Sequence, residues 1–501
     1  MDALTINALV AIGICLFFLL QGVSYYREIK DEESFFLYNR KLPDGEYAVS
    51  FAAASTSLAT VLFFFVTFGV EHGIYIFFAP ITYVLGCYLY SKLLLPPLEK
   101  QGFFQQREIS STGGVITLGT TLTKYVEERY KSNAVKFSIT LITILGLTSI
   151  LLVELYVGVN IFSIYLKPQF VDLALFGVAF VVFTYTGLGG FIAVVRTDVF
   201  QLRLMFLSAV ILLAWLVWAS LQNHIFPSSE IFIVHPIVFK GGILLPYTLL
   251  FNILVVNLFL VPALLRTWQM AAASPSSKEV KKGIIKGVWL TALLTTMFIL
   301  LGILFFRSVF PNAELSLIGM LNALHTSQNP LARYILFPLF FAGCLAALLS
   351  TADSALAPVL QSFSQDIRKS NARHSWKHRH VLLLTAILFI ITISLYFVVF
   401  RLLGFNLITW LFTIFSFLII CTPSIVFAII SPDNVVNRRA SKITALISIW
   451  GGFIVAILLS IVGNKLKIIE IVQLNSPLAS LFGSLCFLVL WVVYKIKGVW
   501  A

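Results

Sequence analysis

The chain has 501 residues, of which 59% are hydrophobic and only 11% are charged, and its mean hydropathy is +0.96. Soluble domains carry roughly a quarter charged residues, so this composition excludes a soluble protein and indicates an all-α polytopic membrane protein. The net charge of +13 is spread between apolar runs rather than gathered on one basic face with aromatic residues, so we expect the lipid bilayer as surroundings and no nucleic-acid partner.

The chain begins with "MDALTINALVAIGICLFFLL", which has an acidic residue, no basic region and an apolar run of about 20 residues. These features are typical of a first membrane span rather than of a cleaved signal peptide. The five cysteines all lie in apolar runs without metal-binding spacing. We therefore expect them to be small core residues that form neither disulfides nor a metal site.

Apolar runs long enough to cross a bilayer recur along the whole chain. We expect about thirteen spans, at residues 3–25, 46–70, 73–95, 137–165, 170–187, 198–222, 243–265, 284–308, 334–365, 380–400, 404–430, 441–463 and 475–495. An odd number of spans places the two termini on opposite sides of the membrane.

The lysines and arginines indicate the orientation of these spans. About 28 of the 35 basic residues lie on one set of alternating connections, including a group from Arg266 to Lys286. The positive-inside rule then places the amino terminus outside and the carboxyl terminus in the cytoplasm. The "RHSWKHRH" run at 373–380 has no acidic or cysteine neighbours, so we interpret it as a cytoplasmic anchoring loop rather than a metal site.

Three spans contain polar residues at the depth of the bilayer. They are "SFAAASTSLAT" at 50–60, "FNILVVNLFLVPALL" at 251–265 and "GCLAALLSTADSALAP" at 343–358. Small residues allow close helix packing, and a proline within a span frees backbone carbonyls that can be satisfied by neighbours or can hold an ion.

In the span at 343–358, Asp353 favours a role in holding an ion. A carboxylate in mid-membrane is costly and usually marks a functional site. Ser350, Asp353 and Ser354 share one helix face, and Thr351 lies one step around the helix. Such an all-oxygen surface suits a hard cation such as Na⁺ and suits thiophilic metals poorly.

Four stretches resemble the sodium:solute symporter family. "GGFIAVVRTDVFQ", Gly189 to Gln201, is similar to the family signature, in which a Gly-Gly pair precedes an Ala-Val step and then Thr-Asp-x-x-Gln. "SFFLYNRKLP" at 34–43 resembles the segment before the first core helix, and "WQMAAASPSSKEVKKG" at 268–283 resembles the cytoplasmic loop after the sixth. "LSTADSAL" at 349–356 resembles the eighth core helix in its aspartate-containing variant.

The resemblance implies a LeuT-type fold, with two inverted five-helix repeats in spans two to six and seven to eleven. The first helix of each repeat would be broken at the membrane midplane. On this basis we divide the chain into an extra helix with its linker at 1–45, the two repeats at 46–222 and 223–430, and two C-terminal helices at 431–501.

The resemblance also implies a sodium site made of backbone carbonyls and hydroxyls from the first and eighth core helices. By position its ligands fall on Ala53, Thr56, Ala347, Ser350 and Thr351. A second ion site of some members falls on Asp198, Ser350, Asp353 and Ser354. Asp353 departs from the serine of that pattern, and two neighbouring acids either bind sodium more tightly or share a proton.

The same comparison argues against a sugar as the solute. Asn257 is kept, but Leu260 and Val261 stand where sugar-transporting members have an aromatic pair, and Thr291 stands in place of a sugar-binding lysine. The expected polar contacts to a solute are Ser55, Thr60 and Asn257.

We therefore expect a sodium-coupled secondary transporter of a small organic solute in a plasma membrane, namely a bacterial inner membrane, with Na⁺ as the co-transported ion. One alternative is a proton-coupled transporter on the same fold that uses Asp198 and Asp353. Another is a membrane sensor with a transporter-like input domain. The histidines are not paired with a nucleophile, so we expect no enzyme, and no motif indicates an obligate protein partner.

Overall fold

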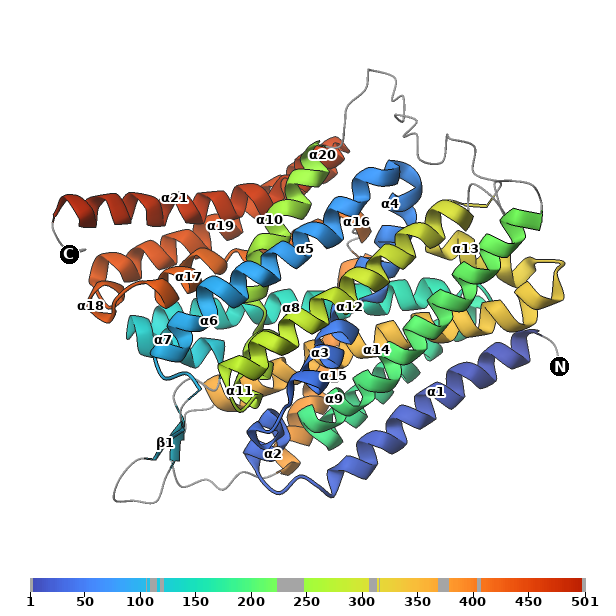
Figure 1. Cartoon of the computed structure of the whole chain (residues 1–501), viewed down its shortest axis with the longest axis horizontal. Helices are drawn as coiled ribbons and strands as arrows, with labels where there is room; N and C mark the ends of the chain where they lie inside the picture. The colour runs from blue at the N-terminus through green and yellow to red at the C-terminus, as the bar shows by residue number, and fades with distance from the viewer. Residues whose placement is uncertain are drawn as a thin grey trace.

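The computed structural model describes residues 3–104, 106–108, 115–117, 121–222, 247–305, 313–314, 316–367, 378–402 and 407–497. Almost all of this is helix, in a bundle whose long helices run along one common direction (Figure 1). Helix α1 (Ala3–Tyr26) begins at one end of the bundle, and α21 (Asn475–Ile496) ends at the opposite end. The first and last described helices thus end on opposite sides of the bundle, as an odd number of spans requires.

The described helices account for the expected number of spans. Ten helices are long and apolar enough to cross a membrane, and two bent helix pairs bring the number to twelve. One of the ten, α9 (Pro168–Gln222), has 55 residues and is interrupted at Gly190. A straight helix of that length would measure about 80 Å, more than twice the hydrocarbon thickness, so α9 forms two spans and the number rises to thirteen.

Gly190 makes the reversal between the two arms of α9. Its φ of +59° is accessible to glycine and strained for residues with a Cβ, and a Cβ built there would lie 2.5 Å from the carbonyl oxygen of Phe35. Residues 188–197, expected as a connection between spans, are therefore helical apart from Gly190, and most of them are buried. The expected span boundaries at 187 and 198 are wrong because a single glycine completes this turn.

The elements that precede the second bent pair follow the expected order. They are α2 (Glu32–Leu37), η1 (Tyr38–Arg40), α3 (Asp44–Ser55), η2 (Leu58–Phe63), α4 (Phe64–His72), η3 (Gly73–Phe77), α5 (Phe78–Leu89), η4 (Tyr90–Leu94), α6 (Leu95–Lys100), α7 (Leu122–Tyr130), α8 (Asn133–Phe162) and α9. Between α6 and α7, β1 (Gln106–Glu108) pairs antiparallel with β2 (Val115–Thr117), a small exception to the all-helical expectation.

The remaining elements form the second set of core helices and the C-terminal helices. They are α10 (Tyr247–Ala263), α11 (Leu265–Ala273), α12 (Ser277–Leu304), α13 (Leu317–Thr326), η7 (Ala332–Leu336), α14 (Phe337–Ser362), η8 (Phe363–Ile367), α15 (His378–Tyr396), η9 (Phe397–Leu402), α16 (Leu407–Ile419), α17 (Thr422–Ile430), α18 (Asp433–Val436), α19 (Arg439–Leu466), α20 (Ile469–Gln473) and α21. In Figure 1, α1 and the α19–α21 pair lie on opposite outer sides of the bundle.

Burial distinguishes the central helix from those that face lipid. The membrane window that contains α14 is 89% buried, whereas that of α1 is 17% buried. Helix α14 packs against both arms of α9 and against α8, α3 and η2. Polar residues on α14 are therefore held inside the protein, where an ion or a solute can be kept from lipid.

Both bent pairs correspond to the expected broken helices. The axis turns by 57° between Asp44–Ser55 and Leu58–Gly69, and by 44° between Tyr247–Ala263 and Leu265–Ala273. At the first break the Ser57 hydroxyl accepts a hydrogen bond from the Thr60 amide at 2.9 Å and so caps the second half-helix. At the second, Leu264 is extended two residues after Pro262, which lacks an amide donor.

Candidate functional site

The amide end of the first break is capped by a carboxylate from a neighbouring span. Glu154 on α8 is fully buried and accepts hydrogen bonds from the Ser57 hydroxyl, the Leu58 amide at 3.1 Å and the Ala59 amide at 3.3 Å. The first turn of a helix carries partial positive charge and unsatisfied amides, so it stabilises an anion. The sequence interpretation did not single out Glu154, although it is an acid within a predicted span, just as Asp353 is.

The carbonyl end of the same break carries a cation. Arg266 Nη2 donates to the Phe51 carbonyl oxygen at 3.2 Å and to Ser55 Oγ at 3.1 Å, and its guanidinium lies 5.6 Å from the centroid of the Phe51 ring. Our assignment of Arg266 to a basic cytoplasmic connection is wrong, because the span continues past Leu264 as α11. The side chain is buried, with 7% exposure, and reaches the middle of the protein.

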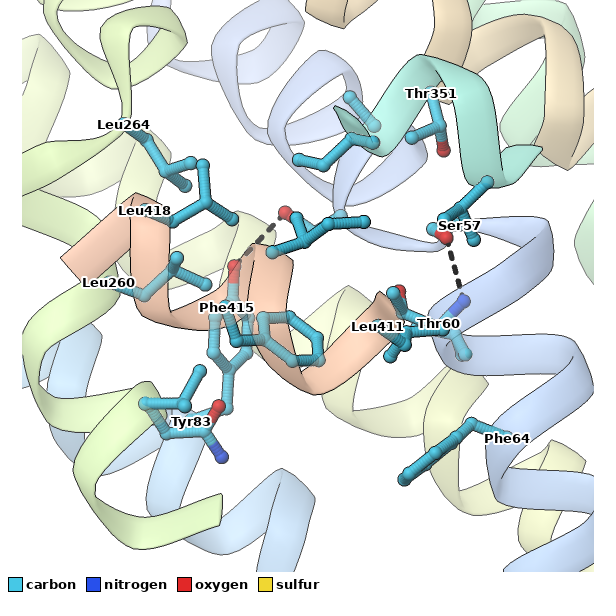
Figure 2. A pocket seen from close by; sticks show the side chains of 18 of the residues that line it. Ser57, Thr60, Phe64, Tyr83, Leu260, Leu264, Thr351, Leu411, Phe415 and Leu418 are labelled. Atoms are coloured by element: carbon cyan, nitrogen blue, oxygen red, sulfur yellow. Dashed lines mark hydrogen bonds between the residues drawn. The ribbon is translucent and has the colours of Figure 1, made fainter. Parts of the chain in front are cut away.

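A cavity of about 180 Å³ lies beside the first break, between α3–η2, α5, α8, α10, α12, α14 and α16. Figure 2 shows Ser57, Thr60 and Thr351 on one side of this cavity, and Leu260, Leu264 and Leu418 on the opposite side. Phe415 and Phe64 contribute aromatic surface to it. The cavity is therefore mostly apolar, with a few hydroxyls gathered at the break.

The three predicted solute contacts all line this cavity. Ser55 Oγ accepts hydrogen bonds from the Tyr83 hydroxyl at 3.0 Å and from Arg266, so its own proton remains available for donation. Thr60 lies in the first turn after the break. Asn257 uses its amide nitrogen to bond the Ala79 carbonyl at 3.0 Å and the Thr82 hydroxyl at 2.8 Å, which ties α10 to α5.

The residues predicted to bind sodium belong to the first break and to α14, which packs against α3 and η2. The Thr56 amide donates to the Ala53 carbonyl at 3.1 Å, which leaves that oxygen with a second lone pair. Ala347 and Ser350 are fully buried on α14. Thr351 lines the cavity, and its hydroxyl has no hydrogen-bond partner among the described residues.

The two aspartates of the predicted second ion site both join α14 to α9. Asp198 accepts hydrogen bonds from Ser50 and Ser350, each at 2.5 Å, and Asp353 accepts one from the Tyr185 hydroxyl at 2.5 Å. Both carboxylates are fully buried. Asp198 comes from the second arm of α9 and Tyr185 from the first, so α14 is attached to both arms.

Ser354 has a different neighbourhood from Asp353. It lines the cavity together with Thr351, three residues earlier, whereas Ser350 and Asp353 contact α9. Ser50 and Tyr185, which complete the environment of the two acids, were not anticipated from the sequence. Tyr185 lies only four residues before the signature segment and Ser50 begins the polar stretch at 50–60, but a tertiary contact with an acid leaves no local pattern.

Ion pairs hold the amino end of α3. Glu46 accepts a hydrogen bond from Tyr38 at 2.7 Å and pairs with Arg196 at 2.9 Å, while Asp44 pairs with Lys286 at 2.5 Å. Arg196 thus pairs with Glu46 and not with Asp198. These contacts attach the first half-helix to α9 and α12 at the end opposite the break.

Comparisons with known proteins agree with this architecture. The structure is similar to a substrate-bound, outward-open Na⁺-coupled sialic acid symporter with a novel Na⁺ site, at 16% identity, coverage of 96% of each chain and a TM-score of 0.69. It is similar to the Eremococcus coleocola manganese transporter in complex with an aromatic bis-isothiourea substituted compound, at 13% identity over 94% of this chain and 97% of that chain, with a TM-score of 0.55. It is also similar to MhsT in complex with L-phenylalanine, at 14% identity over 88% of this chain and 97% of that chain, with a TM-score of 0.53.

No curated protein sequence matches the chain significantly. The structural similarities confirm the LeuT-type fold, and the apolar helices make the protein a multi-pass membrane protein. The model of the sodium:solute symporter family matches residues 35–452, which is most of the chain. The expected transporter is thereby confirmed and the enzyme excluded: the chain belongs to the sodium:solute symporter family and is a sodium-coupled transporter of a small solute.

Proposed function

We propose that this protein imports a small organic solute, held in the cavity beside the first helix break, with Na⁺ bound by Ala53, Thr56, Ala347, Ser350 and Thr351. The observation that carries the proposal is the position of Thr351. Its hydroxyl, which has no hydrogen-bond partner in the described part of the chain, lines the cavity and lies on the helix that packs against the break. A cation bound there touches both α3 and the wall of the solute cavity.

Coupling follows from this shared position. A sodium ion between the carbonyls of the break and the hydroxyls of α14 joins directly two helices that are otherwise linked by packing and through Asp198. It also orders the wall against which the solute binds. Since binding free energies are linked, the factor by which sodium raises solute affinity equals the factor by which solute raises sodium affinity.

Asp198, Asp353 and Ser354 form a second site for Na⁺ or for a proton. Asp353 and Ser354 lie within one turn of Ser350 and Thr351 on α14. Ser350 belongs to both groups because its hydroxyl donates to Asp198. Two acids this close repel each other when both are ionised, which favours a bound cation or proton between them.

We further propose a bacterial inner membrane, with the amino terminus outside and the carboxyl terminus in the cytoplasm. The ends of α6, α7 and α21 gather at one end of the bundle (Figure 1), and each carries a basic residue, namely Lys100, Arg129 and Lys495. The positive-inside rule supports that end as the cytoplasmic one. The lipid bilayer is the expected environment.

The test is a cation titration of the purified protein, followed by thermal unfolding in NaCl, KCl or choline chloride at constant ionic strength. We expect Na⁺ alone to raise the unfolding temperature, because a ligand that binds the native state stabilises it. The double variant Ser350→Ala/Thr351→Ala should lose this response.

The matched control is Thr140→Ala/Thr143→Ala, which removes two hydroxyls that bond to carbonyls of their own helix, α8, at 2.9 and 2.7 Å. It should keep the full sodium response. An equal response to all three cations, or a full sodium response in the Ser350/Thr351 variant, would refute the assigned site.

A further inference from the structure

Among the described residues, the solute cavity is lined by one side chain with a permanent positive charge. Arg266 and Glu154 are the charged residues among the described lining residues. We propose that the solute is an organic monocarboxylate with a compact apolar body, and that Arg266 binds its carboxylate. The proposal rests on the proposed function in one respect, which is that this cavity is the solute site.

The charge of Arg266 is incompletely compensated by its neighbours. No carboxylate lies within ion-pair distance of it among the described residues, and its Nε has no hydrogen-bond partner there. A buried guanidinium stays charged, and leaving it without an anion is costly. The Phe51 carbonyl, the Phe51 ring and Ser55 supply only part of what water would provide.

The remaining N–H groups of Arg266 have a shape that suits a carboxylate. The two described hydrogen bonds of Arg266 both come from Nη2. A guanidinium presents its N–H groups as a planar fork that matches the two oxygens of a carboxylate, and such pairs are stronger than bonds to neutral acceptors. An anionic head with planar geometry is therefore the ligand that this residue recognises best.

The amino end of the half-helix after the first break is not available to a carboxylate of the solute. The amino end of a half-helix commonly binds the carboxylate of a solute in transporters with broken helices. Here the Leu58 and Ala59 amides already donate to Glu154. A second carboxylate at that end would find these donors occupied and would be repelled by Glu154, so an anionic solute is directed to Arg266.

The cavity wall away from Arg266 suits an apolar body of the solute. The Thr291 and Thr295 hydroxyls on the cavity wall donate to carbonyls of their own helix at 3.1 and 2.9 Å, and the amide nitrogen of Asn257 bonds α5. Few groups remain to satisfy the hydroxyls of a polyol, since an unmet buried hydroxyl is costly. The aromatic and aliphatic walls, with Phe64, Leu260 and Phe415 among them, suit an apolar body.

The test compares isosteres on the full-length protein in detergent. Thermal unfolding is followed with propionate, butyrate, isovalerate and benzoate, each beside its neutral amide, in NaCl and in KCl, with total Na⁺ held constant within each series. We expect at least one carboxylate to raise the unfolding temperature in NaCl. Its amide should have no effect, because it lacks the charge that Arg266 complements.

Two variants separate binding from structural support. Arg266→Gln should abolish the carboxylate response and keep the response to sodium alone, and Arg266→Lys should weaken the apparent Kd about tenfold or more, because an ammonium lacks the fork. Thr143→Val, a nearly isosteric change on α8 outside the cavity lining, should keep both responses.

Three results would overturn the proposal. They are an amide that acts as strongly as its acid, a carboxylate response that survives in Arg266→Gln, and the absence of any carboxylate response in a protein that responds to sodium. In each of these Arg266 would serve only to hold α11 against α3. Loss of the sodium response in the unmodified protein would instead refute the proposed function, so the two failures are distinguishable.

Discussion

The two broken helices of this protein are built differently. The first break has a charge at each end, with Glu154 at the amides and Arg266 at the carbonyls, and its hydroxyls line the cavity. At the second break, Trp268 Nε1 donates to the Pro262 carbonyl at 2.7 Å, and the hinge residue Leu264 makes no side-chain cap. The first break therefore presents groups that can bind an ion or a solute, whereas the second break serves as a bend in the helix.

The difference has a functional consequence, because the second break supplies a residue to the first. Leu264 lets the chain turn by 44°, and that turn places Arg266, two residues later, against the last turn of α3. An unbroken helix would present Arg266 on a different face and at a different depth. Substitutions at the two breaks and at the contacts of α3 can therefore separate their roles.

The largest effect is expected from removal of the Glu154 carboxylate. Glu154→Ala leaves the Leu58 and Ala59 amides and the Ser57 hydroxyl buried without their acceptor, which costs about 2–4 kcal/mol of unfolding free energy. We expect uptake to be lost and the sodium response to weaken at least tenfold. Denaturant unfolding in detergent and sodium titration measure the two effects.

Glu127→Ala is the matched control, because it removes a partly exposed carboxylate that pairs with Lys136 at the surface. Such pairs contribute about 0–1 kcal/mol. If Glu154→Ala were no more destabilised than this control, the two ends of the first break would not depend on fixed charges.

The next effect is expected at Asp198, which holds α3 and α14 together through two serines. Asp198→Asn keeps the shape but removes the charge that both hydroxyls bond, so we expect a loss of about 1–3 kcal/mol and a weaker response to sodium. Asp353→Asn disturbs a contact with Tyr185 that does not involve α3, so it should affect the primary sodium response less. Sodium titrations of both variants measure the two effects. A larger loss of sodium affinity in Asp353→Asn than in Asp198→Asn would contradict this prediction.

Much of this architecture was predictable from the sequence. The spans, the broken first helices and the oxygen-rich face of α14 follow from hydrophobic runs, from a mid-membrane aspartate at helical spacing and from the family signature. Ser55, Thr60 and Asn257 belong to the two broken helices and line the cavity, and their contact with a solute stays a prediction.

The residues that were missed were misjudged for physical reasons. Arg266 follows an apolar run, which is where a loop normally begins, and only the three-dimensional turn at Leu264 keeps it inside the protein. Glu154 is surrounded in sequence by apolar residues, and its partners lie almost a hundred positions away. Tertiary contacts that compensate a buried charge leave no local pattern in the sequence.

A smaller effect is expected at the second break. Trp268→Phe removes the hydrogen bond to the Pro262 carbonyl and keeps most of the ring packing against Phe103 and Tyr125. The loss of unfolding free energy should be about 1 kcal/mol, with sodium binding unchanged and transport slowed, because the hinge and not the ion site is altered. A sodium affinity that fell as far as in Asp198→Asn would contradict the distinction between the two breaks.

The smallest effect on stability is expected at the far end of the first half-helix. The Glu46–Arg196 pair has a half-exposed arginine, with 45% exposure, so Glu46→Gln should cost at most about 1 kcal/mol. If this end of α3 closes the path from the cavity to the cytoplasm, the weakened pair allows it to open more often. Alkylation of a Ser55→Cys variant from that side should then be faster in Glu46→Gln than with Glu46 intact. An unchanged rate would mean that α3 is held by packing alone and that these ion pairs do not control its movement.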